Sequence, residues 1–156
     1  RRANLKGALD SARRAQELAP EIGATAFAVG RVLAELGTYK EAIAALSEAR
    51  RVAPDEVDAY VLEAFLLRES GQEGDALAVL MEAWDRGSRS ELLAEQLSLL
   101  LLSAGRASAA LKIAEDALQE QPNSVPVRFA KGMALVAIPE RRSEVDFRLL
   151  DPQTQP

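Results

Sequence analysis

The chain has 156 residues, of which 48% are hydrophobic and 28% are charged, a composition typical of a globular protein. Cysteine and histidine are both absent, which excludes disulfide bonds and removes the commonest general base and zinc ligand. The net charge of −5 argues against a nucleic-acid partner, because proteins that bind phosphate backbones usually carry a basic stripe. The most apolar run, 92–102, is interrupted by Glu95 and Gln96 and is too short for membrane insertion.

A helical pattern runs along the chain from its start to about residue 137. The first helix, over 4–18, has the pattern of the second half of a helical hairpin. We therefore expect that the sequence begins inside a repeat of a longer protein, and a native helix that caps the N-terminus is the alternative. The helices expected after it cover 23–36, 39–53, 56–70, 72–86, 90–104, 107–120 and 125–137.

The first complete hairpin has the clearest boundary signals. Gly37 is expected to end its first helix, because glycine adopts the left-handed conformation at little steric cost. Thr38 and Glu41 have the spacing of a capping box for the second helix. That helix cannot continue through Pro54, and Asp55 is the expected N-cap of the helix that follows.

The regular pattern ends after the helix over 125–137, for which Ser124 is the expected N-cap. Pro139 then stands where the pattern calls for a turn glycine. The remainder, 139–156, is predicted to be a capping segment with a short helix from about residue 142 to 150, followed by a polar tail.

A shift of 34 residues superimposes the hairpins on one another, so that Gly37 matches Gly71 and Gly105. The other matched columns of small residues are Ala42, Ala76 and Ala110; Ala49, Ala83 and Ala117; and Gly30, Ala64, Ser98 and Gly132. One short hairpin cannot bury its own apolar faces, so these copies are expected to stack.

The pattern resembles the tetratricopeptide repeat, whose period is about 34 residues. The residues that carry the resemblance are Gly30, Gly37, Tyr39, Ala42, Ala49 and Pro54. The resemblance implies an all-α fold, a right-handed superhelix (α-solenoid) of stacked antiparallel helix-turn-helix hairpins. We expect the repeat array over 1–138. Its parts are the second helix of a partial repeat at 1–22, full repeats at 23–56, 57–90 and 91–124, and the first helix of a last repeat at 125–138.

In tetratricopeptide repeat proteins the first helix of each hairpin lines a concave groove, so the resemblance implies which side chains face a partner. The groove residues expected on this chain are Phe27, Arg31, Leu62, Phe65, Arg68, Leu99, Leu102, Phe129 and Met133. This set is more apolar than a solvated surface, and monomeric proteins seldom expose a large apolar patch without a use for it. The predicted function is a scaffold that binds a peptide or helix of a partner protein in an apolar groove.

The groove and the array also admit other interpretations. The phenylalanines would have no ligand if they only packed between neighbouring first helices. The segment that carries Phe147, Leu149 and Leu150 would itself occupy the groove if it folded back. The array as a whole would be a structural spacer within a larger multidomain protein, or would form a homo-oligomer through the groove or the exposed terminal helix.

No motif for catalysis or for a cofactor is found, so the chain is predicted not to be an enzyme. The glycines stand singly at the repeat turns, the serines lack a histidine to activate them, and no residues have the spacing of a metal site. Glu63 occupies a position that is usually apolar in the resembled family, so we expect its side chain to be partly buried with a solvent-facing stem, and not to be a catalytic group. Trp84 is expected to fill space between repeats.

Overall fold

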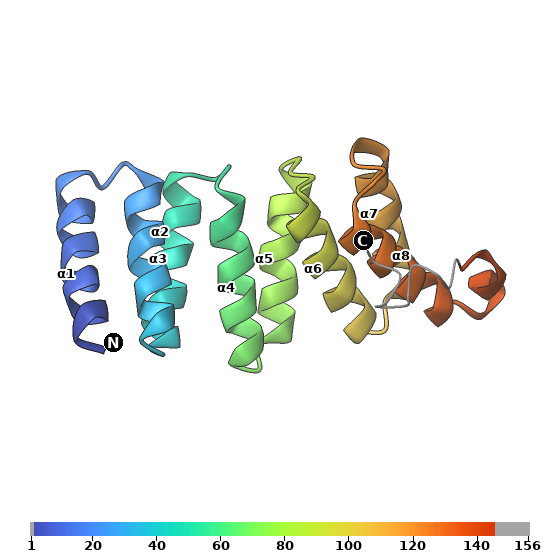
Figure 1. Cartoon of the computed structure of the whole chain (residues 1–156), viewed down its shortest axis with the longest axis horizontal. Helices are drawn as coiled ribbons and strands as arrows, with labels where there is room; N and C mark the ends of the chain where they lie inside the picture. The colour runs from blue at the N-terminus through green and yellow to red at the C-terminus, as the bar shows by residue number, and fades with distance from the viewer. Residues whose placement is uncertain (1, 146–156) are drawn as a thin grey trace. The chain divides into compact units, whose positions relative to one another are not determined.

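The computed structural model describes residues 2–145, and this range is built from helices (Figure 1). In chain order they are α1 (Arg2–Leu18), α2 (Gly23–Glu35), α3 (Tyr39–Val52), α4 (Val57–Glu69), α5 (Glu73–Asp85), α6 (Glu91–Ser103), α7 (Ala107–Glu120), α8 (Val125–Ala137) and the 3-10 helix η1 (Pro139–Glu144). The all-α prediction is confirmed, and the ends of α1 to α8 agree with the expected ends within two residues.

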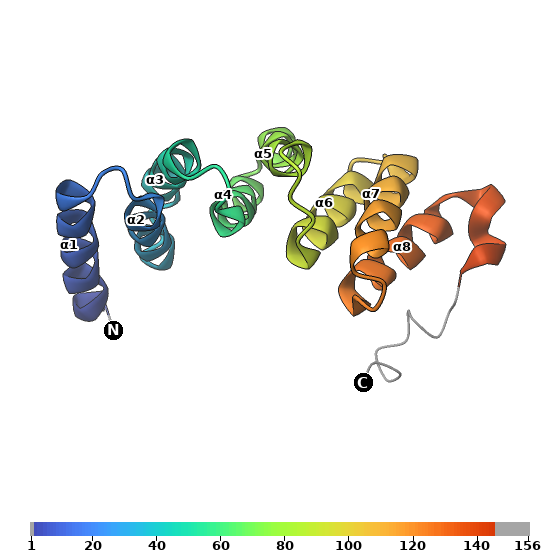
Figure 2. The same cartoon turned by 90° about the horizontal axis from the view of Figure 1, so that it is seen from above.

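The described chain divides into two compact units, the first ending at Ala83 and the second beginning at Trp84, near the end of α5. In the first unit α1 packs on α2, α2 on α3 and α3 on α4, so that neighbours in sequence are neighbours in space. Figure 2 shows α2 and α4 on one side of this unit and α3 on the other. In the second unit α6, α7 and α8 contact one another, and η1 packs on α8.

The core of the first unit depends on small residues that let α2 and α3 approach closely. Ala42 and Ala49, two of the repeated alanines, are completely buried. A Cβ atom on Gly30 would lie only 2.6 Å from Leu46 Cγ, so no larger residue fits there without movement. The recurrence of small residues at this position of the repeat fits this close approach. The repeat pattern did not indicate the same constraint at Gly23, where an added Cβ atom would clash with that of Ala53.

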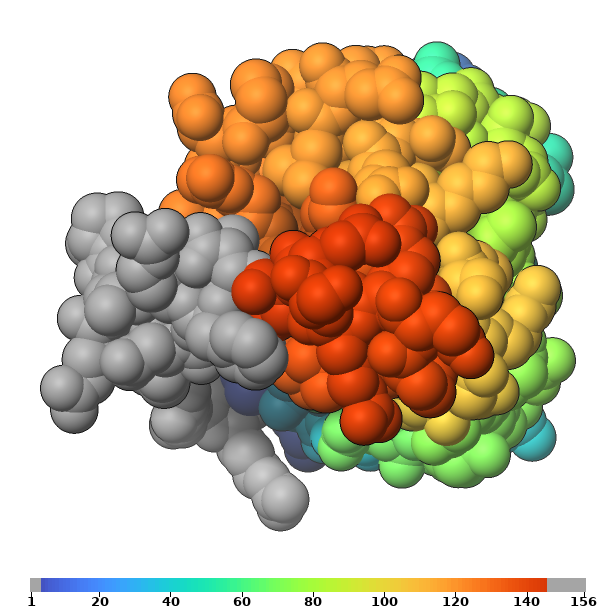
Figure 3. Space-filling model, turned by 90° about the vertical axis from the view of Figure 1, so that its right-hand side faces the viewer, coloured from blue at the N-terminus to red at the C-terminus, as the bar shows by residue number. Residues whose placement is uncertain are grey.

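The second unit repeats this packing with one polar variation. Ala110 and Ala117 of α7 are buried like their counterparts in the first unit. Ser98 of α6 occupies the small-residue column, is fully buried and donates a hydrogen bond of 3.3 Å to the carbonyl oxygen of Ala110. Figure 3 shows the end of this unit, where η1 (red) lies beside α7 (orange). Arg141 of η1 pairs with Glu115 of α7 at 3.7 Å.

The turn glycines are confirmed, because Gly37, Gly71 and Gly105 have φ angles of +80°, +76° and +71°. The capping box predicted for Thr38 and Glu41 is wrong. The Thr38 hydroxyl makes no cap bond to α3 and instead donates to the carbonyl oxygen of Leu33 at 3.0 Å, where it satisfies the C-terminal end of α2.

Two other predicted caps have different outcomes. Glu56, and not Asp55, occupies the N-cap of α4, and its side chain makes no cap hydrogen bond. Ser124 is confirmed as the N-cap of α8, because its side-chain oxygen accepts a hydrogen bond of 3.3 Å from the Val127 N–H.

The C-terminal part of the described chain differs from the prediction of a short helix over 142–150. A 3-10 helix forms instead over Pro139–Glu144, with the proline at its start where a missing N–H has little cost. Val145 is extended, and residues 146–150 of the predicted helix lie outside the described residues. No helix in the described range is both long and apolar enough to span a membrane.

Candidate functional site

The first unit contributes five of the nine predicted groove residues, Phe27 and Arg31 on α2 and Leu62, Phe65 and Arg68 on α4. Phe65 is the most exposed apolar member, with 49% of its surface accessible. Phe27 and Leu62 are half-buried and pack against the core of the unit. These two side chains therefore fill space between helices and also border the surface. For Phe27, this agrees in part with the interpretation that the phenylalanines pack between neighbouring first helices.

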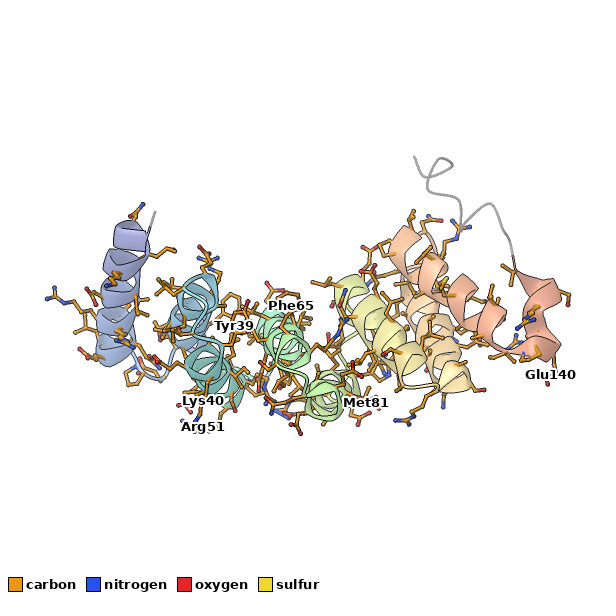
Figure 4. All side chains as sticks on the ribbon, turned by 90° about the horizontal axis from the view of Figure 1, so that it is seen from below. Tyr39, Lys40, Arg51, Phe65, Met81 and Glu140 are labelled. Atoms are coloured by element: carbon orange, nitrogen blue, oxygen red, sulfur yellow. The ribbon has the colours of Figure 1, made fainter. Side chains whose placement is uncertain are left out.

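The periodicity of α4 explains why Phe65 faces outward. Tyr60, Ala64 and Leu67 point into the core, and Leu62 and Phe65 lie three residues apart on another face of the helix. In Figure 4, Phe65 lies on the opposite side of the first unit from the labelled Lys40, Arg51 and Met81. The exposed cations Arg31 and Arg68 lie on the same two helices as the apolar residues.

The second unit contributes the other four predicted residues, Leu99 and Leu102 on α6 and Phe129 and Met133 on α8. Met133 is 39% exposed and the other three are half-buried. α6 and α8 are in contact, so this unit has an apolar face of its own. Leu92 at the start of α6 is a further exposed apolar residue, at 46%, that lies outside the predicted set.

A shallow, open pocket of about 430 Å³ lies at the other end of the second unit, between the start of α7 and the end of α8. Residues 105–109 and 137–140 line it. Arg106 and Glu140 are its charged side chains, and both are exposed. Over the described part of the chain, no group of histidine, cysteine, aspartate or glutamate residues has the arrangement of a metal site.

The most strongly buried charges lie in the first unit, and sequence reasoning missed their arrangement. Glu63 is 4% exposed, so it is buried more deeply than expected, and the prediction of a solvent-facing stem is wrong. Arg50 Nε donates to Glu63 Oε2 at 2.6 Å and Arg50 Nη2 donates to Glu63 Oε1 at 3.2 Å. Arg50 Nη1 donates to Glu82 Oε2 at 2.6 Å. One guanidinium therefore joins α3, α4 and α5.

An aromatic ring completes this charged cluster. Arg50 Cζ lies 4.9 Å from the centre of the Tyr60 ring, a cation–π contact. The Tyr60 hydroxyl donates to the carbonyl oxygen of Pro54 at 3.1 Å and approaches Glu82 Oε1 at 3.3 Å. Side chains of α3, α4 and α5 therefore form the cluster, and a backbone carbonyl group of the loop before α4 also bonds to it.

The pKa values of the cluster follow from its burial and its charges. Burial raises the pKa of Glu63 above the ordinary 4.5, and the nearby Glu82 carboxylate acts in the same direction, while the Arg50 bonds act against them. Burial disfavours the charged form of Arg50, but its bonds to the two carboxylates outweigh that effect and raise its pKa. Arg50 is therefore a permanent cation, and Glu63 is a carboxylate of the cluster whose pKa is raised.

The repeat alignment holds the signal that would have identified this cluster. A shift of 34 residues places Arg50 on Trp84 and Glu63 on Leu97. Two opposite charges thus stand in columns that are apolar one repeat later, which is the pattern of a buried ion pair. Lys131, in the column of Glu63, is 35% exposed and pairs with Glu115 at 3.4 Å.

Trp84 is 5% exposed, which agrees with the expectation that it fills space. Arg89 Cζ lies 4.1 Å from the centre of its ring, and Arg89 Nη1 donates to the Trp84 carbonyl oxygen at 2.8 Å. Gln121 Nε2 in turn donates to the Arg89 carbonyl oxygen at 2.8 Å. This tryptophan is covered and presents no ring to a ligand.

Comparison with solved structures finds the same arrangement of helices in other proteins. MamA from Desulfovibrio magneticus RS-1 has a TM-score of 0.71 at 17% identity, with 96% of this chain and 86% of that chain aligned. YrrB, a tetratricopeptide repeat protein with an unusual peptide-binding site, has a TM-score of 0.68 at 22% identity, covering 91% of this chain and 73% of YrrB. TTC0263, a thermophilic tetratricopeptide repeat protein of Thermus thermophilus, has a TM-score of 0.67 at 21% identity, covering 86% of this chain and 74% of TTC0263. No protein-family model and no curated protein sequence matches the chain.

Proposed function

The chain has the fold of tetratricopeptide repeat proteins, and on that premise we propose that it is a non-enzymatic scaffold that binds an apolar peptide segment or helix of a partner protein. The binding face in the first unit consists of Phe27, Leu62 and Phe65, flanked by Arg31 and Arg68. The peptide-binding site of YrrB supports a peptide as the kind of ligand that this fold accommodates.

The exposure of Phe65 carries this proposal. A phenylalanine that is 49% exposed on the first-helix side of the unit is an anchor that a partner would cover. Covering a whole phenylalanine side chain stabilises by about 1.5–3 kcal/mol, so the exposed half of Phe65 contributes roughly 1 kcal/mol. A ligand of useful affinity therefore needs several apolar anchors along the face, and a peptide or helix supplies them better than a small molecule does.

A peptide-display selection on the full chain tests the proposal. We expect the selected peptides to be rich in apolar residues and to lose affinity by roughly tenfold or more on Phe65→Glu, which places a charge at a central anchor. Ala44→Glu is the matched control, because Ala44 is exposed on α3 and the substitution changes the charge equally. Circular dichroism confirms that both variants are folded.

Two results of this experiment would refute the binding face. One is a selection that enriches no peptide on the unmodified chain. The other is an equal loss of affinity in Phe65→Glu and Ala44→Glu, which would trace the effect to charge and not to the loss of an apolar anchor.

Self-association is the second candidate function, and the surface of α1 favours it. Leu18 is 86% exposed and Ile22, just after the helix, is 50% exposed. Ala8 and Ala15, which match the buried Ala42 and Ala49, are exposed on the same helix. Light scattering on the purified chain distinguishes the two candidates, since a monomer at micromolar concentration excludes stable association through this helix.

A further inference from the structure

The Arg50 cluster of the first unit holds one positive charge between two negative ones. The side chains of Arg50 and Glu63 are 13% and 5% exposed, whereas that of Glu82 is 49% exposed. Each carboxylate has an oxygen 2.6 Å from the guanidinium. Because a single cation cannot neutralise two carboxylates, the cluster has a surplus negative charge, and Glu82 is its most exposed member.

Among the aligned repeats, this combination of charges occurs once. The pairs of residues that match Arg50 and Glu63 in the other repeats are Gln16 with Val29, Trp84 with Leu97, and Leu118 with Lys131. None of these pairs sets a carboxylate in the column that Glu63 occupies. The charged junction is therefore a local feature of the hairpins formed by α3, α4 and α5 and not a general property of the fold.

We propose that Arg50, Glu63 and Glu82 form a proton-binding junction, in which Glu63 takes up one proton in mild acid and the packing of α3, α4 and α5 becomes more stable. The proton binds at Oε1 of Glu63, the oxygen with the longer hydrogen bond to Arg50, 3.2 Å. Arg50 and Glu82 then form a pair of balanced charge. Glu63 Oε2 keeps its bond of 2.6 Å to Arg50 Nε, so the junction stays connected when the proton is bound.

The charged groups around Glu63 are few, and they act on its pKa in opposite directions. Arg50 faces it from α3 and Glu82 from α5, and Tyr60 of its own helix is the neighbouring aromatic group. α2 also contacts α4, but its charged residues Arg31 and Glu35 are exposed. Burial and Glu82 raise the pKa of Glu63 against the opposing effect of Arg50.

The sign of the pH dependence follows from this raised pKa. Between the ordinary pKa of 4.5 and the higher value in the folded state, the folded chain binds more protons than the unfolded chain. The folded state therefore gains stability as the pH falls through this window, and it loses that contribution as the pH rises through the folded-state pKa. Most carboxylates of folded proteins behave in the opposite way.

A carbon-detected NMR titration of the Glu63 carboxyl group in the full chain, from about pH 3 to about pH 8, tests the proposal. We expect its midpoint to lie above 4.5, and we expect Glu82→Gln to lower the midpoint because the variant removes the surplus charge. Glu73→Gln, at an exposed position of the same helix as Glu82, is the control that should leave the midpoint unchanged. A Glu63 midpoint at or below 4.5, or one that Glu82→Gln does not move, would overturn the proposal.

Urea unfolding of the unmodified chain and of Glu63→Gln provides the second measurement. The two chains share every other carboxylate, so the difference in their pH dependence reports Glu63 and its interaction with Glu82. As the pH falls through the window, the unfolding equilibrium constant of the unmodified chain should decrease relative to that of Glu63→Gln. The decrease is at most about tenfold per pH unit, which is the limit for the uptake of one proton. Parallel pH dependences would overturn the proposal. If Glu63→Gln does not fold, the NMR titrations of the unmodified chain and of Glu82→Gln are sufficient to test the proposal.

Discussion

Gly30→Ala is the substitution that tests most directly how closely α2 and α3 pack. A Cβ atom at position 30 would lie 2.6 Å from Leu46 Cγ, 2.8 Å from Leu46 Cδ2 and 3.3 Å from the carbonyl oxygen of Ala42. Leu46 is completely buried, so its side chain has no solvent into which it can move. The added methyl group must therefore push the two helices apart or force Leu46 out of its rotamer.

Two opposing terms set the expected magnitude. Replacing a helical glycine by alanine stabilises a helix interior by about 1 kcal/mol. Overpacking a closely packed core costs about 1–3 kcal/mol, and contacts this short against both a branched side chain and the backbone place Gly30 at or beyond the upper end. We expect Gly30→Ala to lower the unfolding free energy by about 2 kcal/mol, which corresponds to a fall in Tm of roughly 4–8 °C for a chain of this length.

Gly7→Ala is the matched control for this measurement. Gly7 lies inside α1, and within the described chain no atom beyond its own helix backbone and chain neighbours lies within 4 Å of a Cβ built on it. The same chemical change should there raise stability by up to about 1 kcal/mol. Thermal and urea unfolding followed by circular dichroism compare the two variants. If Gly30→Ala proves as stabilising as Gly7→Ala, the close approach of α2 and α3 is wrong.

Two further substitutions test the phase of the repeat and the charged cluster. Ala76→Leu should lower the unfolding free energy by about 1–3 kcal/mol, because Ala76 is completely buried in the repeated alanine column. Glu73→Ala, at an exposed position, should leave the melting temperature nearly unchanged. Similar melting temperatures for the two variants would contradict the proposed phase of the repeat. Arg50→Met should cost about 3–5 kcal/mol, because it leaves Glu63 buried without its cation, whereas Arg51→Met removes only an exposed pair with Glu48. Equal unfolding midpoints in urea for Arg50→Met and Arg51→Met would show that the buried cluster does not contribute to stability.

The candidate binding face was predictable only in part. The resemblance to the tetratricopeptide repeat placed Phe65 and Met133 on first helices, and both are substantially exposed. It treated Phe27 and Leu62 in the same way, although both pack partly against the core. Position along a helix indicates the direction in which a side chain leaves the backbone. The side chains and the packing angle of the neighbouring helix decide how much of that side chain remains in contact with water.

The helices, their turns and the buried alanine columns could be predicted from the order of residues. These features depend on local conformation and on a repeated spacing, and both can be read directly from the order of residues: Gly37 must adopt a positive φ, and Ala42 recurs every 34 residues on the face toward its partner helix. The tertiary structure alone decided that the Thr38 hydroxyl bonds to Leu33 and that Arg50 meets Glu63. A hydroxyl or a charge accepts whichever partner the folded chain brings within about 3 Å, and that partner is set by the packing of neighbouring helices and not by the residue's own periodicity.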